Sequence, residues 1–420
     1  MRSDNWRYGE LGSYSIVEMG QSPPGSSCNA EQRGMPLLNG PTEFGSKYPT
    51  PKQWTTEPKR ICRPGDLLFC VRGSTTGRMN WADQTYAIGR GLAAIRHVEG
   101  AEYQHFLKGA IDAGLEGLLQ MATGSTFPNV SKPQILSLRS PIPPVPEQRS
   151  IAATLSCLDD KIELNNRMNK TLEEMAQALF KSWFVDFDPV KAKMEGREPT
   201  GMDAETATLF PDEFEDSELG QIPKGWRVGS IYDIAEVLYG APYKSTLFTS
   251  RPEGYPLIRI RDLKTLSPQF FTNEDHPRRV LVNPGDIIVG MDAEFVPCVW
   301  MGKVGVLNQR VCKFVPRNPF TSHLMLYFLI MPHMAYLQHA KVGTTVSHFG
   351  KGDVDRIRTI VPKADIQACY SKLSDNILQS MLVCKATNIA LKEIRDTLLP
   401  KLMSGEIRVP EAEDILEEVL

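Results

Sequence analysis

The sequence predicts an α+β chain in which two duplicated globules, each a twisted sheet plus helices, are separated by two long helices forming an antiparallel coiled coil. Three observations predict this fold. A heptad pattern fills a long segment without Pro or Gly, a second such pattern lies near the other end, and short landmarks recur about 220 residues apart. Together they indicate a pseudo-twofold molecule rather than an array of short repeats.

The stretch that begins at Pro146 is the first predicted long helix. Neither Pro nor Gly interrupts residues 147–184, and the residues of one stripe follow each other in alternating steps of three and four. That spacing keeps the stripe facing a partner helix, as in a coiled coil. Two amides, Asn165 and Asn169, occupy its centre, where polar side chains can fix register and partner choice. The stripe consists of Leu155, Leu158, Ile162, Asn165, Asn169, Leu172, Ala176 and Leu179.

The second long helix has the same spacing and a polar centre of its own. We expect the two helices to pair antiparallel, with one polar centre against the other. The alternative is two unrelated amphipathic helices, each packed on its own globule. The second stripe consists of Tyr370, Leu373, Ile377, Ser380, Cys384, Thr387, Leu391, Ile394 and Leu398.

Four landmarks occur twice in the same order, at an offset of 219 or 220 residues. This repetition indicates that one globule and the helix after it were duplicated. The pairs are Trp6-Arg7 with Trp226-Arg227, Pro64–Leu68 with Pro284–Ile288, Gly124-Ser125-Thr126 with Gly343-Thr344-Thr345, and Leu172–Leu179 with Leu391–Leu398.

Each globule mixes short apolar runs after turn residues, typical of strands, with stretches of helical spacing. Pro332 is expected to kink or split the helix that contains it. The predicted strands are Asp66–Val71, Glu236–Tyr239, Leu257–Ile260, Asp286–Val289 and Val304–Val306, and the predicted helices are Tyr103–Met121 and Ser322–Ala340.

These elements divide the chain into six segments. Residues 188–222 are rich in Pro, Gly and acidic residues, which is typical of a linker. The predicted segments are a first globule at 1–145, a central helix at 146–187, the linker at 188–222, a second globule at 223–362, a C-terminal helix at 363–408 and a tail at 409–420.

Charge alternates along the chain although the net charge is only −3. Lys and Arg outnumber Asp and Glu by 16 to 13 in residues 1–150 and by 17 to 11 in residues 221–362. Acidic residues dominate by 16 to 7 in residues 151–220 and by 10 to 7 in residues 363–420. Basic globules favour a polyanionic partner, whereas acidic helices favour protein contacts.

Composition also excludes several classes. No run of about 18 apolar residues occurs, so we expect no membrane span. The N-terminal sequence lacks an apolar signal region, and we expect a cytoplasmic protein. The eight Cys include no C-x-x-C pair, which indicates reduced thiols rather than a zinc site or disulfides.

The search for catalytic motifs is negative. The sequence has no phosphate-binding loop of the G-x-x-x-x-G-K-[ST] type, no H-E-x-x-H and no Cys/His array. The G-x-x-G of residues 302–305 is too common by chance to indicate an RNA-binding loop. We therefore expect no catalytic residue, no metal site and no cofactor bound by this chain.

The globules do offer cations among glycines and hydroxyls. A loop from Arg72 to Arg78 leaves a predicted strand, and Arg259 and Arg261 lie at strand spacing on one face. Such side chains can contact phosphates and base edges. The alternatives are a solvated hairpin tip and a solvated sheet face. The candidate DNA-binding residues are Arg72, Ser74, Thr75, Arg78, Arg90, Lys244, Arg259, Arg261, Arg278, Arg279, Lys303 and Arg310.

Two stretches resemble a known family. The run Thr123–Lys132, followed by Pro141–Arg149 and then directly by the long helix, is similar to the end of a target recognition domain in Type I restriction–modification specificity subunits. The segment Leu398–Ile407 looks like the end of their second spacer helix, and the resemblance covers essentially all 420 residues. The second half departs from the pattern, because Val361–Gln367 stands where the Pro-Pro-x-x-Glu-Gln signature is expected.

The resemblance implies a non-catalytic subunit with two target recognition domains, each reading half of a split site in double-stranded DNA. It also implies that the helices set the spacing and dock two methyltransferase subunits, which bind S-adenosylmethionine, and that restriction motor–nuclease subunits join for cleavage. The stripe from Leu155 to Leu179 spans about 36 Å, close to one duplex turn. The alternatives are a self-contained DNA methyltransferase or nuclease with unrecognised motifs, and a coiled-coil scaffold without DNA binding.

Overall fold

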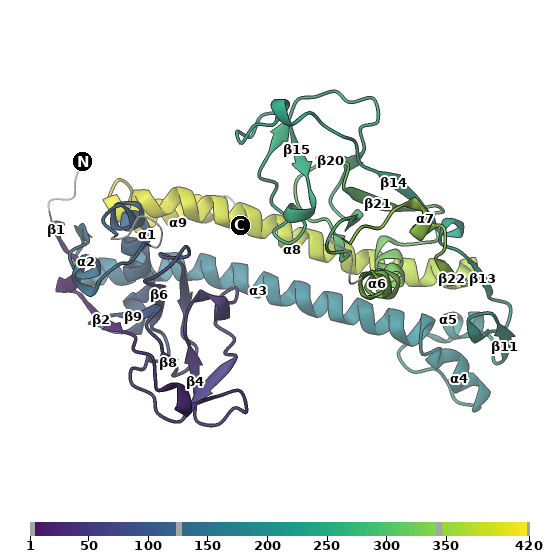
Figure 1. Ribbon diagram of the computed structural model, residues 1–420, viewed down its shortest axis with the longest axis horizontal. Coiled ribbons are helices and arrows are strands. Elements are labelled where there is room, and N and C mark those ends of the chain that lie inside the picture. The colour runs from purple at the N-terminus through teal and green to yellow at the C-terminus, as the bar shows by residue number, and fades with distance from the viewer. Residues whose placement is uncertain (1–4, 123–127, 342–346, 418–420) are drawn as a thin grey trace. The chain divides into compact units, whose positions relative to one another are not determined.

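The computed structural model describes residues 5–122, 128–341 and 347–417. The chain divides into two compact units: unit 1 comprises Met1–Leu164 with Asn388–Leu420, and unit 2 comprises Asn165–Thr387. In Figure 1 the helices and strands are coloured along the chain, from purple at the N-terminus to yellow at the C-terminus. The long helices α3 (Val145–Phe184) and α8 (Ala364–Ser404) each pass from one unit into the other. Each unit therefore combines one globule with part of both long helices.

Unit 1 contains a four-stranded antiparallel sheet, a second sheet with one parallel pair, and a two-stranded ladder. Its elements are β1 (Arg7–Glu10), β2 (Ser15–Met19), β3 (Cys28–Asn29), β4 (Met35–Leu38), β5 (Gln53–Thr55), β6 (Leu67–Cys70), β7 (Met79–Trp81), β8 (Ala87–Ile88), β9 (Leu92–His97), α1 (Gln104–Gln120), α2 (Lys132–Leu136), β10 (Arg139–Ile142) and α9 (Val409–Glu417). The strand orders are β2–β9–β6–β7, β3–β5–β4–β8 and β1–β10, and β4 with β8 is the parallel pair.

Unit 2 repeats this architecture. Its elements are α4 (Asp188–Met194), α5 (Ala204–Leu209), β11 (Phe214–Ser217), β12 (Gly220–Pro223), β13 (Arg227–Ser230), β14 (Ala235–Tyr239), β15 (Tyr255–Ile258), β16 (Phe271–Thr272), β17 (Leu281–Val282), β18 (Ile287–Gly290), β19 (Pro297–Val299), β20 (Gly305–Leu307), β21 (Val311–Pro316), α6 (His323–Ala340), α7 (Lys351–Val354) and β22 (Arg358–Val361). The strand orders are β14–β21–β18–β19, β16–β15–β20–β17, β13–β22 and β11–β12. The parallel pair recurs as β15 with β20, so the predicted duplication is confirmed in the topology.

The predicted elements of the globules are present with small shifts. The five predicted strands correspond to β6, β14, β15, β18 and β20, with ends displaced by at most two residues, and the two predicted helices are α1 and α6. Pro332 lies inside α6 and does not split it, because the helix runs on to Ala340.

Within unit 1, α3 and α8 pack antiparallel. Leu155 and Ile162 share one core with Leu391 and Leu398. The amide Nδ2 of Asn388 donates to the carbonyl of Ile162 at 3.2 Å. A buried polar centre is therefore present here, but Asn388 fills it rather than the predicted Thr387.

Within unit 2, the same two helices again run antiparallel. Asn169 Nδ2 donates to the Met381 carbonyl at 3.2 Å, and the Tyr370 hydroxyl donates to the Ala176 carbonyl at 3.3 Å. Asn165 is 4% exposed, as expected for the polar centre.

The first turns of α8 differ from the predicted stripe by one residue. Leu373 is 46% exposed, whereas Ser374, Leu378 and Met381 are buried. The Ser374 hydroxyl donates to the hydroxyl of Ser322, which precedes α6, so this part of the helix also packs on the globule. A straight α-helix drifts relative to a 3.5-residue repeat, and the contact with α6 favours the rotated face.

The predicted linker and tail are packed structure. Val190 in α4, Phe210 after α5 and Ile222 in β12 are at most 2% exposed and belong to the core of unit 2. In the tail, Ala412 in α9 is fully buried in unit 1. Trp183, at the end of α3, packs edge-on against Phe210 with ring centroids 5.2 Å apart. The polar composition of these segments conceals the few apolar residues that anchor them.

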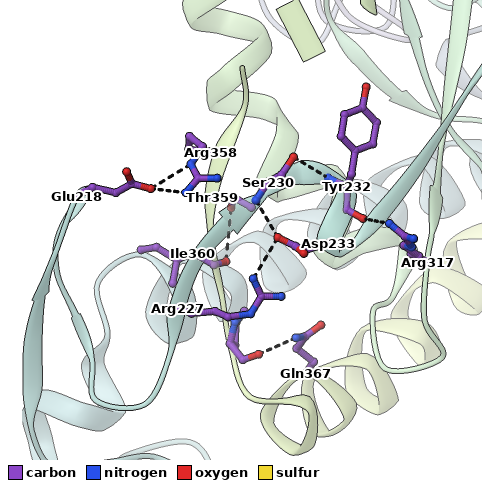
Figure 2. A network of polar contacts seen from close by, with 11 residues as sticks. Glu218, Arg227, Ser230, Tyr232, Asp233, Arg317, Arg358, Thr359, Ile360 and Gln367 are labelled. Atoms are coloured by element: carbon purple, nitrogen blue, oxygen red, sulfur yellow. Dashed lines mark hydrogen bonds and ion pairs between the residues drawn. The ribbon is translucent and has the colours of Figure 1, made fainter. Parts of the chain in front are cut away.

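The beginnings of the two long helices match more closely than their sequences do. Gln148 Nε2 donates to the Pro143 carbonyl at 2.9 Å, and Gln367 Nε2 donates to the Pro362 carbonyl at 2.8 Å. Figure 2 shows Gln367 beside the β13–β22 ladder and its polar contacts. Gln367 therefore takes the place of Gln148 although the surrounding signature is absent.

Candidate nucleic-acid interface

The loop from β6 to β7 holds the first group of candidate residues. Gly73 and Gly77 have φ angles of 91° and 92°, a conformation that residues with a Cβ rarely adopt. The Thr76 hydroxyl donates to the Gly73 carbonyl at 2.7 Å and to the Pro128 carbonyl at 2.9 Å. Such bonds give the loop a defined shape, so it is more than a solvated hairpin tip.

The backbone after β6 lies between two other segments of unit 1. Val71 donates its N–H to the Gly91 carbonyl and accepts from the Val130 N–H, both at 2.9 Å. The next residue, Arg72, forms a β-bridge with Asn129, and its Nε donates to the Asn129 side chain at 3.1 Å. Three segments that are distant in sequence therefore meet where Arg72 emerges.

Five predicted residues gather at this end of β6. Arg78 is next to Cys70, since the Cys70 N–H donates to its carbonyl at 2.8 Å. Arg90 adjoins Gly91, the residue bonded to Val71. The side chains of Arg72, Ser74, Arg78 and Arg90 are exposed, and Thr75 is half-buried. Their guanidinium and hydroxyl groups can donate to phosphates and to base edges.

Unit 2 has the same backbone arrangement after β18. Met291 donates its N–H to the Arg310 carbonyl at 2.9 Å and accepts from the Phe349 N–H at 3.0 Å. The next residue, Asp292, forms a β-bridge with His348. Its carboxylate contacts Arg310 Nε at 3.3 Å and His348 Nδ1 at 2.5 Å. Sequence reasoning found Arg310 but missed Asp292 and His348, although the offsets from Arg72 and Asn129 pointed to them.

Arg259 and Arg261 do not share a strand face. Strand β15 ends at Ile258, and the Asp262 carboxylate accepts the Arg259 N–H at 3.0 Å, which closes a short turn that contains Arg261. The Arg259 side chain is 17% exposed, pairs with Asp262 at 3.3 Å and lies 4.4 Å from the Phe270 ring centroid. Arg259 is therefore engaged in the fold, whereas Arg261 is exposed.

The remaining predicted cations of unit 2 lie on other loops, and two of them are beside acidic residues. The Lys244 N–H donates to Glu274 at 2.8 Å, and Arg279 pairs with Asp275 at 3.2 Å. Arg278 is exposed beside them. Lys303 is exposed on the turn from β19 to β20.

One pair of predicted landmarks lies outside the described residues. The repeated Gly124-Ser125-Thr126 and Gly343-Thr344-Thr345 fall in the two undescribed gaps. Over the described ranges, no group of three or more His, Cys, Asp or Glu could hold a metal ion. No described helix is both long and apolar enough to cross a bilayer.

Comparisons with known proteins agree with this architecture. A model of the Type I restriction modification DNA specificity domain matches residues 4–174 and again residues 223–379. The chain is 27% identical over 337 residues to the Type I restriction enzyme HindI specificity subunit of Haemophilus influenzae, covering 69% of this chain and 73% of that protein. It is 29% identical over 372 residues to the MjaIX specificity subunit of Methanocaldococcus jannaschii, covering 84% and 80%.

A solved structure shares the fold. The crystal structure of a Type I restriction–modification system S subunit from M. genitalium matches with a TM-score of 0.56 and 16% sequence identity. The match covers 95% of this chain and 96% of that one.

Proposed function

Because the chain belongs to the Type I restriction–modification DNA specificity family, as a specificity subunit with two domains, we propose that each unit reads one half of a split site in double-stranded DNA. The observation that carries this proposal is the recurrence of one surface in both units. In each, the segment after the third strand of the four-stranded antiparallel sheet, β6 or β18, emerges between two other segments. An exposed arginine lies there in both units: Arg72 on that segment in unit 1, and Arg310 on a neighbouring segment in unit 2. A scaffold without DNA binding would not require these cations.

We propose a second role for the long helices. Parts of α3 and α8 belong to both units, so their length is suited to fix the number of base pairs between the half-sites. A helix of 40 residues is about 60 Å long at 1.5 Å per residue. The family resemblance and the helices' exposed faces support docking of two methyltransferase subunits there, with S-adenosylmethionine bound by those subunits and restriction motor–nuclease subunits joining them.

This proposal makes the chain a non-catalytic DNA reader that works in the cytoplasm. The competing function is a self-contained methyltransferase or nuclease. The two functions differ in a simple assay: the purified chain with labelled S-adenosylmethionine and DNA transfers no methyl group if catalysis belongs to its partners.

Mapping of methylated adenines in cells that carry the complete system tests the proposal. Exchanging residues 1–145 for the first globule of another specificity subunit should change one half of the methylated sequence and leave the other intact. Inserting four residues between Asn166 and Leu172, with a matching insertion in α8, adds about 6 Å and should lengthen the spacer by one or two base pairs. Alteration of both halves in the exchange, or an unchanged spacer after the insertion, would contradict the respective role.

A further inference from the structure

Equivalent positions in the two units carry opposite charges. Arg72 follows β6 and Asp292 follows β18 at the same position in the two sheets. Each forms a β-bridge with the segment that comes after helix α1 or α6. In unit 1 this residue is an exposed cation held by an amide, Asn129. In unit 2 it is a carboxylate, 26% exposed, with Arg310 on one oxygen and His348 on the other. Unit 2 therefore does not present a cation at this place directly.

The carboxylate is suited to hold an arginine rather than to meet DNA itself. An unpaired carboxylate would be repelled by phosphates, but both Asp292 oxygens are occupied: Oδ1 by His348 Nδ1 and Oδ2 by Arg310 Nε. An amino group of cytosine would have to compete with these two partners for the same oxygens. The neighbouring acid, Glu294, is itself paired with Lys264 at 2.7 Å.

Arg310 keeps the groups needed for base recognition. Its side chain is 55% exposed, and its contact with Asp292 uses Nε. In the part of unit 2 that the structure describes, no hydrogen bond occupies its two terminal amino groups. Those are donors that arginine can direct at O6 and N7 of guanine. A side chain already held in place also loses less conformational entropy on binding.

We propose that Arg310 reads a guanine in the half-site of unit 2, and that Asp292 and His348 are its positioning residues. In unit 1 the corresponding reader is Arg72, which projects from the loop position itself. This inference rests on the proposed function, since it assigns one base of the half-site that unit 2 reads. It also explains why unit 2 bears an acid in a surface that faces a polyanion.

The test uses methylated-adenine mapping with the full chain in the complete system. Arg310→Ala and Arg310→Lys should each relax one guanine of the unit 2 half-site, lowering discrimination there by roughly tenfold or more. Asp292→Asn and His348→Gln should keep the same base preference while reducing the extent of methylation. Arg317→Ala is the matched control, because Arg317 is also exposed and follows the opposite end of β21.

Each outcome decides the inference. A wild-type map without a split motif would overturn the proposed function and this inference with it. With a split motif present, equal loss of methylation at all sequences in Arg310→Ala would mean a phosphate contact and overturn the inference alone. A changed base in Asp292→Asn, with Arg310→Ala unchanged, would make Asp292 the reader instead. A relaxed guanine in the arginine variants, with Arg317→Ala unaffected, supports the inference.

Discussion

Unit 1 and unit 2 share one sheet order but neutralise the same buried acid differently. In unit 1, Asp66 is 3% exposed and pairs with two nitrogens of the Arg96 guanidinium, Nε at 2.8 Å and Nη2 at 2.6 Å. In unit 2, Asp286 pairs with Lys313 at 2.6 Å and has His323 at 3.8 Å. The repeated Pro-Gly-Asp therefore requires a nearby cation, but the cation comes from different positions.

The same acids also close their own turns. Asp66 accepts the Arg63 N–H at 2.7 Å, and Asp286 accepts the Asn283 N–H at 2.6 Å. Backbone bonds and buried acids are thus kept between the units, whereas their partners and the exposed loop residues differ. The comparison separates what maintains the scaffold from what can vary in recognition.

Removing the buried acids should produce the largest effect. Asp66→Ala and Asp286→Ala each leave a mostly buried cation unpaired and a turn N–H without its acceptor, so we expect a loss of about 3–5 kcal/mol in the free energy of unfolding. Chemical denaturation, monitored by hydrogen exchange, should assign each loss of stability to the unit that carries the substitution. Glu213→Ala, which breaks an exposed pair with Lys224, should change the stability far less. Similar losses in all three variants would contradict the shared role.

Changes to the exposed loop should weaken DNA binding with little effect on stability. Arg72→Ala should cost about 1–3 kcal/mol on DNA containing the methylated sequence, and less on unrelated duplexes, because a base contact is lost. Arg259→Ala should differ from it, since Arg259 is paired within the fold and its loss should mainly lower stability. Binding titrations with the assembled complex and thermal unfolding distinguish the two. Equal loss on both DNAs would assign Arg72 to phosphate contact.

The smallest effect is a difference in acid sensitivity. Burial lowers the pKa of His323, so the folded chain binds a proton at this imidazole less readily than the unfolded chain does. As pH falls through about 6.5, the unfolded chain takes up a proton that the folded chain does not, and stability decreases. His323 begins α6 as Gln104 begins α1, so His323→Gln should flatten this decrease for unit 2 only. Unfolding profiles between about pH 5 and pH 8 measure this decrease, and an unchanged slope would rule out this histidine as its source.

The sequence predicted those features that depend on periodicity and repetition. Steps of three and four placed Leu155, Ile162 and Leu398 in the antiparallel helix contact, and the offset near 220 predicted the duplicated sheets. The sequence also predicted that Arg72 and Arg78 lie on one loop, because the two residues are close together in the chain. Features within one element or one repeat are readable in this way.

Features that depend on tertiary contact were not predicted. Leu373 lies outside the contact between α3 and α8 because α8 also packs on α6. Phe210 is held by its contact with Trp183, which belongs to a different helix. Asp292 is a single acidic residue in the sequence and belongs to no motif that would indicate a role. Its partners lie 18 and 56 residues away and become visible only once the strands are paired.

The two units also differ in how they can form during synthesis. Unit 2 is one continuous stretch, Asn165–Thr387, whereas unit 1 needs Asn388 and the residues after it. Leu391, Leu398 and Leu402 of its core are made only after all of unit 2. A growing chain can therefore bury the core of the second globule first. Apolar surface of the first globule stays exposed until the end of α8 has been synthesised. The globule that leaves the ribosome first is the last to be completed, and that interval exposes it to chaperones and proteases.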